Sequence, residues 1–292
     1  MRLAEFATAL RQTLRGSPVV VEEFAVQHRS QSYPFFHFAS PADDTAADAP
    51  VLLLTAGLHG DERAGPITLV RHAPAILERA QQSGLRLSVY PLVNPSGFDN
   101  NTRYNADGDR GEEGNNDFLR YQLEDGSWRG DLGSGGDFRR WAWSCDPLLG
   151  ARLPQETALL HTLLRQQPLD RLVAALDLHQ DCITPTDHPF AYHYAFGDLG
   201  RYVPIVRQVE TLLPVARLRA IGAGQQFAMK TDKNGFLVRH DGTLTDLFHR
   251  LGARHSVAVE TTGDTPLDVA CEVNLLWVEG LIELVANGEW GS

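Results

Sequence analysis

The chain has 292 residues, of which 43% are hydrophobic and 22% are charged, and its formal net charge is −11. This composition is ordinary for a soluble globular protein, and the length is sufficient for a large core. The acidic balance argues against nucleic acid as a partner, because nucleic-acid binding needs a clustered basic face. Three cysteines (Cys145, Cys182 and Cys271) are too few for a disulfide framework.

The N-terminal segment has apolar residues at Leu3, Phe6, Leu10 and Leu14. This spacing is typical of an amphipathic helix and differs from the unbroken apolar core of a signal peptide. No apolar run reaches the length of a membrane-spanning helix. We therefore expect a cytoplasmic protein without a membrane partner.

Strand and helix patterns alternate along the chain, which predicts a layered α/β fold. The predicted strands are 18–26, 33–39, 50–56, 87–92, 172–178 and 255–260. The predicted helices are 3–15, 64–82, 155–167, 200–212, 244–251 and 266–286.

The segment 94–150 lacks clear periodicity, and a loop region of that length inside a domain is usually functional. Neither an internal repeat nor a linker divides the sequence. We expect one domain over residues 1–292.

The stretch "LLLTAGLHGDERAG" runs from an apolar strand into His59 and Glu62, which are three residues apart. A histidine and a carboxylate at short spacing are common ligands of zinc. Such pairs also arise by chance, and a capped turn with a solvated glutamate is the alternative.

A second apolar strand, in "VAALDLHQD", ends with Asp177, His179 and Asp181. Alternation along a strand places Asp177 and His179 on the same face, so Asp177 could orient a metal-binding His179. A histidine at a strand end is otherwise a core or rim residue. Two strands that both end in ligand-type residues favour a shared crevice at their carboxyl ends.

A third strand, in "ARHSVAVETTGDTP", ends at Glu260. Three protein ligands leave a coordination position open for water, as in catalytic zinc sites, and such a site needs a base. Glu260 is our candidate for the base. The alternative is a helix cap or a salt bridge.

These residues, in this order, resemble the zinc carboxypeptidase family, and especially its bacterial members that include murein peptide amidases. The resemblance extends to "NPSGFDNNTRYNADG", which contains Arg103, and to "LPQETALLHTLL". It also includes "DGTLTDLFHRLGARHSVAVE", which leads to the glutamate. The resemblance therefore covers roughly residues 50 to 266 as an ordered series of motifs.

The resemblance implies a three-layer α/β/α sandwich with a central mixed, mostly parallel sheet. It implies one Zn²⁺ per chain, held by His59, Glu62 and His179, and hydrolysis of an amide bond by zinc-activated water. Glu260 would take the proton of that water, and Arg103 would stabilise the oxyanion. Whether a second metal binds through Asp61, Asp177 or Asp181 is left open.

Two departures from the family pattern concern substrate binding. Asn115 matches the family, but Asn116 stands where an arginine that grips the substrate's terminal carboxylate is expected. Arg110 or Arg120 could replace that arginine from nearby. The family's capping tyrosine is also missing, and His240 or Arg239 could occupy its place.

The favoured function is a zinc metallopeptidase, acting as a carboxypeptidase or a peptide amidase. The alternative is an N-acyl amino acid deacylase of the desuccinylase and aspartoacylase type, which "DLHQD" also suits. A catalytically inactive binding protein is a third reading, and the presence of Glu260 argues against it. The oligomeric state is left open.

Overall fold

The computed structural model describes residues 1–41, 48–107, 118–143, 153–183, 186–222, 229–240 and 242–288. Its centre is an eight-stranded mixed sheet with the strand order β1-β2-β4-β3-β8-β13-β9-β12. The strands of this sheet are β1 (Val20–His28), β2 (Gln31–Ala39), β3 (Val51–Ala56), β4 (Arg86–Tyr90), β8 (Leu172–Leu178), β9 (Ala191–Phe196), β12 (Phe236–Leu237) and β13 (His255–Thr261).

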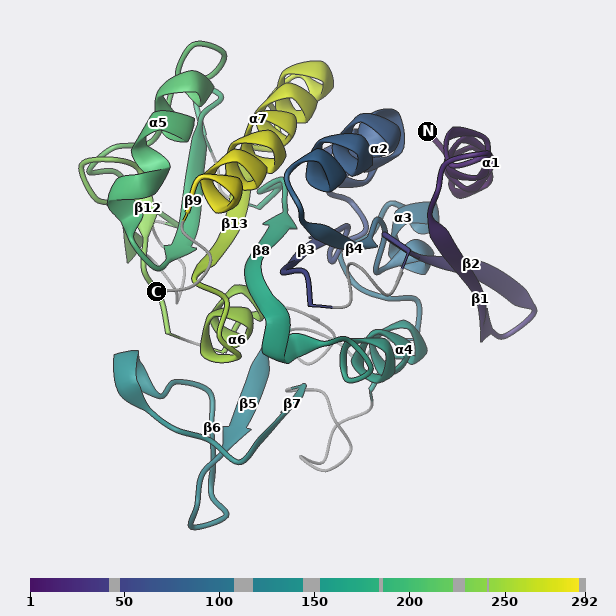
Figure 1. Cartoon of the computed structure of the whole chain (residues 1–292), viewed down its shortest axis with the longest axis horizontal. Coiled ribbons are helices and arrows are strands. Elements are labelled where there is room, and N and C mark those ends of the chain that lie inside the picture. The colour runs from purple at the N-terminus through teal and green to yellow at the C-terminus, as the bar shows by residue number, and fades with distance from the viewer. Residues whose placement is uncertain are drawn as a thin grey trace.

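Helices cover both faces of this sheet (Figure 1). They are α1 (Leu3–Thr13), α2 (Ala64–Gln82), α3 (Pro95–Asn100), α4 (Gln155–Leu164), α5 (Leu199–Val209), α6 (Leu244–Arg250) and α7 (Leu267–Ala286). One core joins α1, α2, α5 and α7 to the first face, and a second core joins α4 and α6 to the other. The predicted three-layer α/β/α sandwich is thus confirmed.

The middle of the sheet is parallel: β3 pairs with β4 and β8, and β8 pairs with β13. In this register Thr55 lies beside Asp177, and Asp177 lies beside Ala258. Parallel strands bring their carboxyl ends to one edge of the sheet. The segments that follow β3 and β8 and the last residues of β13 therefore meet at that edge.

The antiparallel pairs are β1 with β2, β2 with β4, and β13 with β9. All six predicted strands and all six predicted helices are present, with ends shifted by a few residues. The shifts are largest at helix C-termini, where the last turn of the periodic pattern is not helical.

Several elements were not predicted. The strand β9 was missed because "AYHYAF" consists of alanine, aromatic residues and a histidine without an aliphatic run, and both of its faces are buried. The region 94–150 contains α3 and the strands of a small sheet, β5 (Leu119–Gln122), β6 (Trp128–Arg129) and β7 (Arg140–Trp143). A two-stranded sheet of β10 (Ala220–Ile221) and β11 (Met229–Lys230) was also missed.

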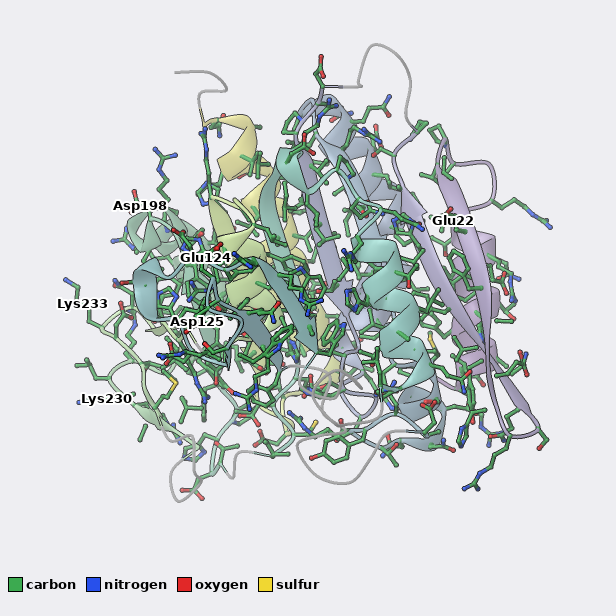
Figure 2. All side chains as sticks on the ribbon, turned by 90° about the horizontal axis from the view of Figure 1, so that it is seen from below. Glu22, Glu124, Asp125, Asp198, Lys230 and Lys233 are labelled. Atoms are coloured by element: carbon green, nitrogen blue, oxygen red, sulfur yellow. The ribbon has the colours of Figure 1, made fainter. Side chains whose placement is uncertain are left out.

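Glu22, Asp198 and Lys233 lie at the periphery of the molecule (Figure 2). Within the described ranges, none of the helices combines the length and the apolar character needed to cross a membrane.

His193 on β9 is an ionisable residue in the core. Its side chain is fully buried, with ring centroids 4.6 Å from Trp277 and 5.9 Å from Phe236. Among the described residues neither ring nitrogen has a hydrogen-bond partner. Burial lowers the pKa of His193 to about 3, and the carbonyl of Gly235 offsets only part of this effect.

We predict that His193 makes the fold sensitive to acid. An unfolded histidine binds a proton near pH 6.5, whereas His193 in the fold does so only near pH 3. Between these two pH values only the unfolded state binds the proton. The free energy of unfolding is therefore unaffected by His193 above pH 6.5 and decreases as the pH falls toward 3. Relative to His193→Phe, the wild type should lose about 2 kcal/mol of unfolding free energy between pH 7 and pH 5, measured by urea denaturation. Parallel pH dependences of the two proteins would contradict this role.

Candidate metal centre and active site

The turn after β3 presents His59 and Glu62 at the carboxyl edge of the sheet. The chain leaves the strand through Gly57, whose φ of +65° favours glycine. Gly60 packs directly against the start of α3, where an added Cβ would overlap the backbone of Gly97 and Phe98. The turn is closed by a hydrogen bond from the Glu62 N–H to the His59 carbonyl, 3.3 Å.

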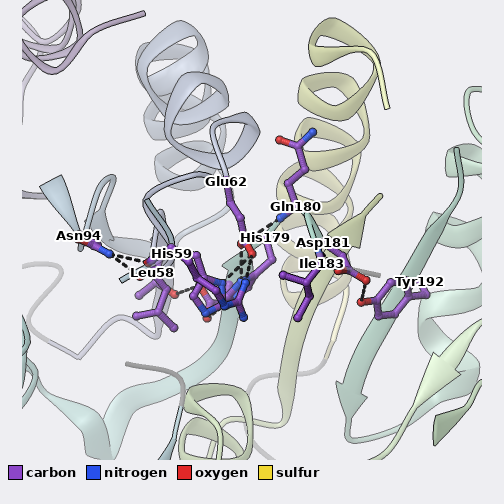
Figure 3. A network of polar contacts seen from close by, with 12 residues as sticks. Leu58, His59, Glu62, Asn94, His179, Gln180, Asp181, Ile183 and Tyr192 are labelled. Atoms are coloured by element: carbon purple, nitrogen blue, oxygen red, sulfur yellow. Dashed lines mark hydrogen bonds and ion pairs between the residues drawn. The ribbon is translucent and has the colours of Figure 1, made fainter. Parts of the chain in front are cut away.

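His59, Glu62 and His179 form a buried cluster whose ligand-type atoms lie within 4.8 Å of one another (Figure 3). Glu62 Oε1 lies 2.7 Å from His59 Nδ1, and Glu62 Oε2 lies 2.9 Å from His179 Nδ1. The backbone N–H of Gln180 also donates to Glu62 Oε2, at 3.1 Å. The structure therefore brings together the three residues that the sequence proposed as metal ligands.

Asp177 fixes the ring of His179 from the opposite side. Its Oδ2 lies 2.8 Å from His179 Nε2, and its Oδ1 accepts a hydrogen bond from Thr55 Oγ1 at 2.7 Å. A carboxylate only accepts, so both ring nitrogens of His179 donate here, Nε2 to Asp177 and Nδ1 to Glu62, and Nδ1 would have to lose its proton to bind a metal ion. This is the contact predicted for Asp177, and Thr55 is an additional member that the sequence did not indicate.

The charges of this cluster are strongly coupled. Burial opposes ionisation of Glu62, but His59 and His179 outweigh it and hold the pKa of Glu62 well below its ordinary value. Burial also disfavours a charged His179, but Asp177 and Glu62 outweigh it and raise its pKa well above the ordinary value. Opposite charges within a few ångströms shift pKa values in these directions.

Glu260 lies at the end of β13, beside the same cluster. The backbone N–H of His179 donates to the carbonyl of Val259 at 2.9 Å, which joins the two strand ends. Among the described residues Glu260 Oε2 is buried without a hydrogen-bond partner. Burial raises the pKa of Glu260 well above its ordinary value, and the charge of His179 opposes that shift.

Asp181 and Tyr192 form a second pair near Glu260. The Tyr192 hydroxyl donates to Asp181 Oδ2 at 2.7 Å (Figure 3). Tyr192 also lies beside Glu260 in the antiparallel register of β9 and β13. The sequence left open whether Asp181 binds a second metal, and in the structure its carboxylate accepts hydrogen bonds from this tyrosine and from the Ile183 N–H.

Arg103 reaches the cluster from the segment after α3. Its Nη1 donates to Glu62 Oε1 at 3.1 Å. Its carbonyl accepts from the Gly60 N–H at 3.2 Å and from Asn94 Nδ2 at 3.0 Å. The guanidinium is thus placed beside the proposed ligands, as the resemblance implies.

The chemistry of this cluster fits a metal ion. Two imidazoles and one carboxylate are a typical zinc ligand set that leaves a coordination position open. Both Nδ1 atoms are directed at the Glu62 carboxylate, and Asp177 supplies the carboxylate partner that metal-binding histidines usually have.

The predicted substrate-binding residues are placed less completely. Asn115, Asn116 and Arg110 lie outside the described residues. Arg120 is exposed on β5, and its guanidinium packs against Gly130, where an added Cβ would collide with it.

His240 and Arg239, the candidates for the place of the tyrosine, follow β12 and are half-buried. His240 Nδ1 lies 3.1 Å from Asp246 Oδ1, and its ring is 4.9 Å from that of Phe196. His240 is therefore held against α6 and β9.

Comparison with known proteins places this geometry in context. Residues 48–122 match the model of the succinylglutamate desuccinylase/aspartoacylase catalytic domain. No curated protein sequence matches the chain.

Solved structures share the fold over nearly the whole chain. A candidate metallopeptidase of Shewanella amazonensis SB2B has a TM-score of 0.66 at 23% identity, covering 97% of this chain and 91% of the other. A candidate metallopeptidase of Shewanella baltica OS155 has a TM-score of 0.65 at 22% identity, with the same two coverages. A metallo-carboxypeptidase of Burkholderia cenocepacia has a TM-score of 0.56 at 14% identity, covering 97% of this chain and 68% of the other.

The sequence resemblance is thereby confirmed: the chain is zinc carboxypeptidase-like in fold, and a quarter of it, which includes His59 and Glu62, is similar to the desuccinylase/aspartoacylase catalytic domain.

Proposed function

We propose that the protein is a zinc-dependent hydrolase of amide bonds. The observation that carries this proposal is the buried His59–Glu62–His179 cluster next to Glu260, whose Oε2 has no hydrogen-bond partner among the described residues. A purely structural cluster has no use for an additional buried carboxylate that is left unpaired, because such a group is costly.

Each residue has a role that its position supports. His59, Glu62 and His179 hold the ion, which when bound supplies the Lewis acidity that lowers the pKa of water and polarises a carbonyl. Glu260 takes the proton from the attacking water and passes it to the leaving amine. The Arg103 guanidinium compensates the negative charge that develops on the carbonyl oxygen.

The substrate is either a peptide, cut by a carboxypeptidase or a peptide amidase, or an N-acyl amino acid. The zinc carboxypeptidase-like fold supports the first reading. The match of residues 48–122 to the desuccinylase/aspartoacylase domain supports the second. Asn116, where an arginine is expected, argues against broad carboxypeptidase activity, since the neutral side chain of asparagine cannot form the bidentate ion pair that arginine forms with a terminal carboxylate.

A substrate panel separates these readings. Zinc-loaded protein is assayed for amine release from free-carboxylate peptides, C-terminally amidated peptides and N-acyl amino acids. We expect hydrolysis within one class and weak turnover of simple free-carboxylate peptides. Efficient cleavage of many such peptides would contradict the inference from Asn116.

We predict one zinc ion per chain. His179→Ala removes a ligand and should abolish stoichiometric zinc, measured by inductively coupled plasma mass spectrometry after dialysis. Asp177→Asn should weaken zinc affinity by about 10- to 100-fold, because it removes the carboxylate that orients His179. The exposed His188→Ala is the matched control and should retain full zinc. Equal zinc in His179→Ala and the wild type would refute the ligand assignment.

Glu260→Gln should lower kcat by about 10²–10⁴-fold, because a positioned general base contributes a factor of this size. The variant should keep its zinc, since Glu260 is proposed as a base and not as a ligand. Steady-state kinetics and metal analysis on the same preparation test both statements. Loss of zinc together with activity would instead place Glu260 among the ligands.

A further inference from the structure

We propose that Glu156 is a positioning residue that holds Arg103 beside the metal cluster. Glu156 lies in the first turn of α4 and is 1% exposed. The sequence indicated its segment only as part of the family resemblance, without a role. The inference rests on the proposed function, because it concerns the group assigned to stabilise the oxyanion.

The Glu156 carboxylate accepts hydrogen bonds from two segments at once. Its Oε1 accepts from the backbone N–H of Ser96, at 2.7 Å, and its Oε2 accepts from Ser96 Oγ, at 2.8 Å. Asn105 Nδ2 also donates to Oε2. A single carboxylate thereby joins the start of α3 to the chain two residues beyond Arg103.

The segment that carries Arg103 is held on both sides by this arrangement. Before Arg103, the Thr102 N–H donates to the Gly97 carbonyl at 2.9 Å. After it, the Ala106 N–H donates to Ser96 Oγ at 2.9 Å, the same hydroxyl that binds Glu156. The backbone of Arg103 is therefore registered against α3 on both sides, and the contacts that follow it in the chain converge on Glu156.

These contacts extend to the turn after β3, which carries the proposed ligands His59 and Glu62. Asn94, the N-cap of α3, accepts from the Gly97 N–H and donates to the carbonyls of Leu58 and Arg103. The Arg103 carbonyl also accepts from Gly60, between the two proposed ligands of the turn. Among the contacts of the described residues, Glu156 itself has no bond to a proposed ligand, so its effect on the site passes through Ser96 and Asn105.

Substitution by glutamine tests the carboxylate with little change in volume. Each carboxylate oxygen faces donors only, so a side-chain amide would direct its NH₂ group at one of them. Burial raises the pKa of Glu156 to about 7, against the hydrogen bonds of Asn105 and Ser96, which favour the carboxylate. The measurements are therefore made at pH 8 or above, where the group is ionised.

The test is a double-mutant cycle of Glu156→Gln and Arg103→Ala on zinc-loaded protein. A misplacement of about 1 Å can cost up to about 10²-fold in rate, so Glu156→Gln should lower kcat by about 10- to 100-fold. KM and zinc content should stay near the wild-type values. In the Arg103→Ala background, Glu156→Gln should cause no further loss, because its effect is exerted through Arg103.

Two controls separate positioning from loss of stability. Val285→Ala removes buried volume in α7 and should lower the melting temperature without changing kcat. Hydrogen exchange of the Gly60, Thr102 and Ala106 amides, which are all hydrogen-bonded, should accelerate in Glu156→Gln and stay unchanged in Val285→Ala.

The experiment distinguishes a failure of the role of Glu156 from a failure of the proposed hydrolase function. An unchanged kcat, or equal losses in both backgrounds of the cycle, would overturn the role of Glu156. If no substrate is turned over, the proposed function fails, and hydrogen exchange still decides whether Glu156 holds the segment. Unchanged exchange at Gly60 and Ala106 would overturn the inference in either case.

Discussion

The organisation of the site depends on the buried carboxylate of Glu62. A charge in a protein interior must be paired, and Glu62 is paired with His59, His179 and Arg103 together. These partners come from the end of β3, the end of β8 and the segment after α3. One carboxylate thus sets the distance between three parts of the chain. A bound metal ion would then be the common partner of His59, Glu62 and His179.

The sequence predicted the parts of the fold that depend on aliphatic periodicity. The strands that end before His59 and His179, and the strand that contains Glu260, are rich in Val, Leu and Ala, and such apolar runs are recognisable without a structure. The parallel connection of two of these strands brings their ends to one edge, so the ligand candidates could be grouped from sequence alone. The predicted contact of Asp177 with His179 follows from the same period of two.

Other features could not be predicted, because they depend on which distant residues meet. The pairing of Glu156 with Ser96 and Asn105 joins positions about 50 to 60 residues apart, and no local pattern specifies it. The strand β9 has no aliphatic signal, since its burial is provided by aromatic and histidine side chains. The interpretation of Asn115 and Asn116 stays a prediction, since they lie outside the described residues.

The close approach of Gly60 to α3 has a consequence for any redesign of this protein. Because a Cβ at this position would overlap the backbone of Gly97 and Phe98, the turn and the helix cannot be varied independently. A library that randomises residues 58–62 would recover functional members almost entirely with glycine at position 60. A change in the backbone of this turn therefore has to be matched by a change in α3, and the two segments have to be redesigned as one unit.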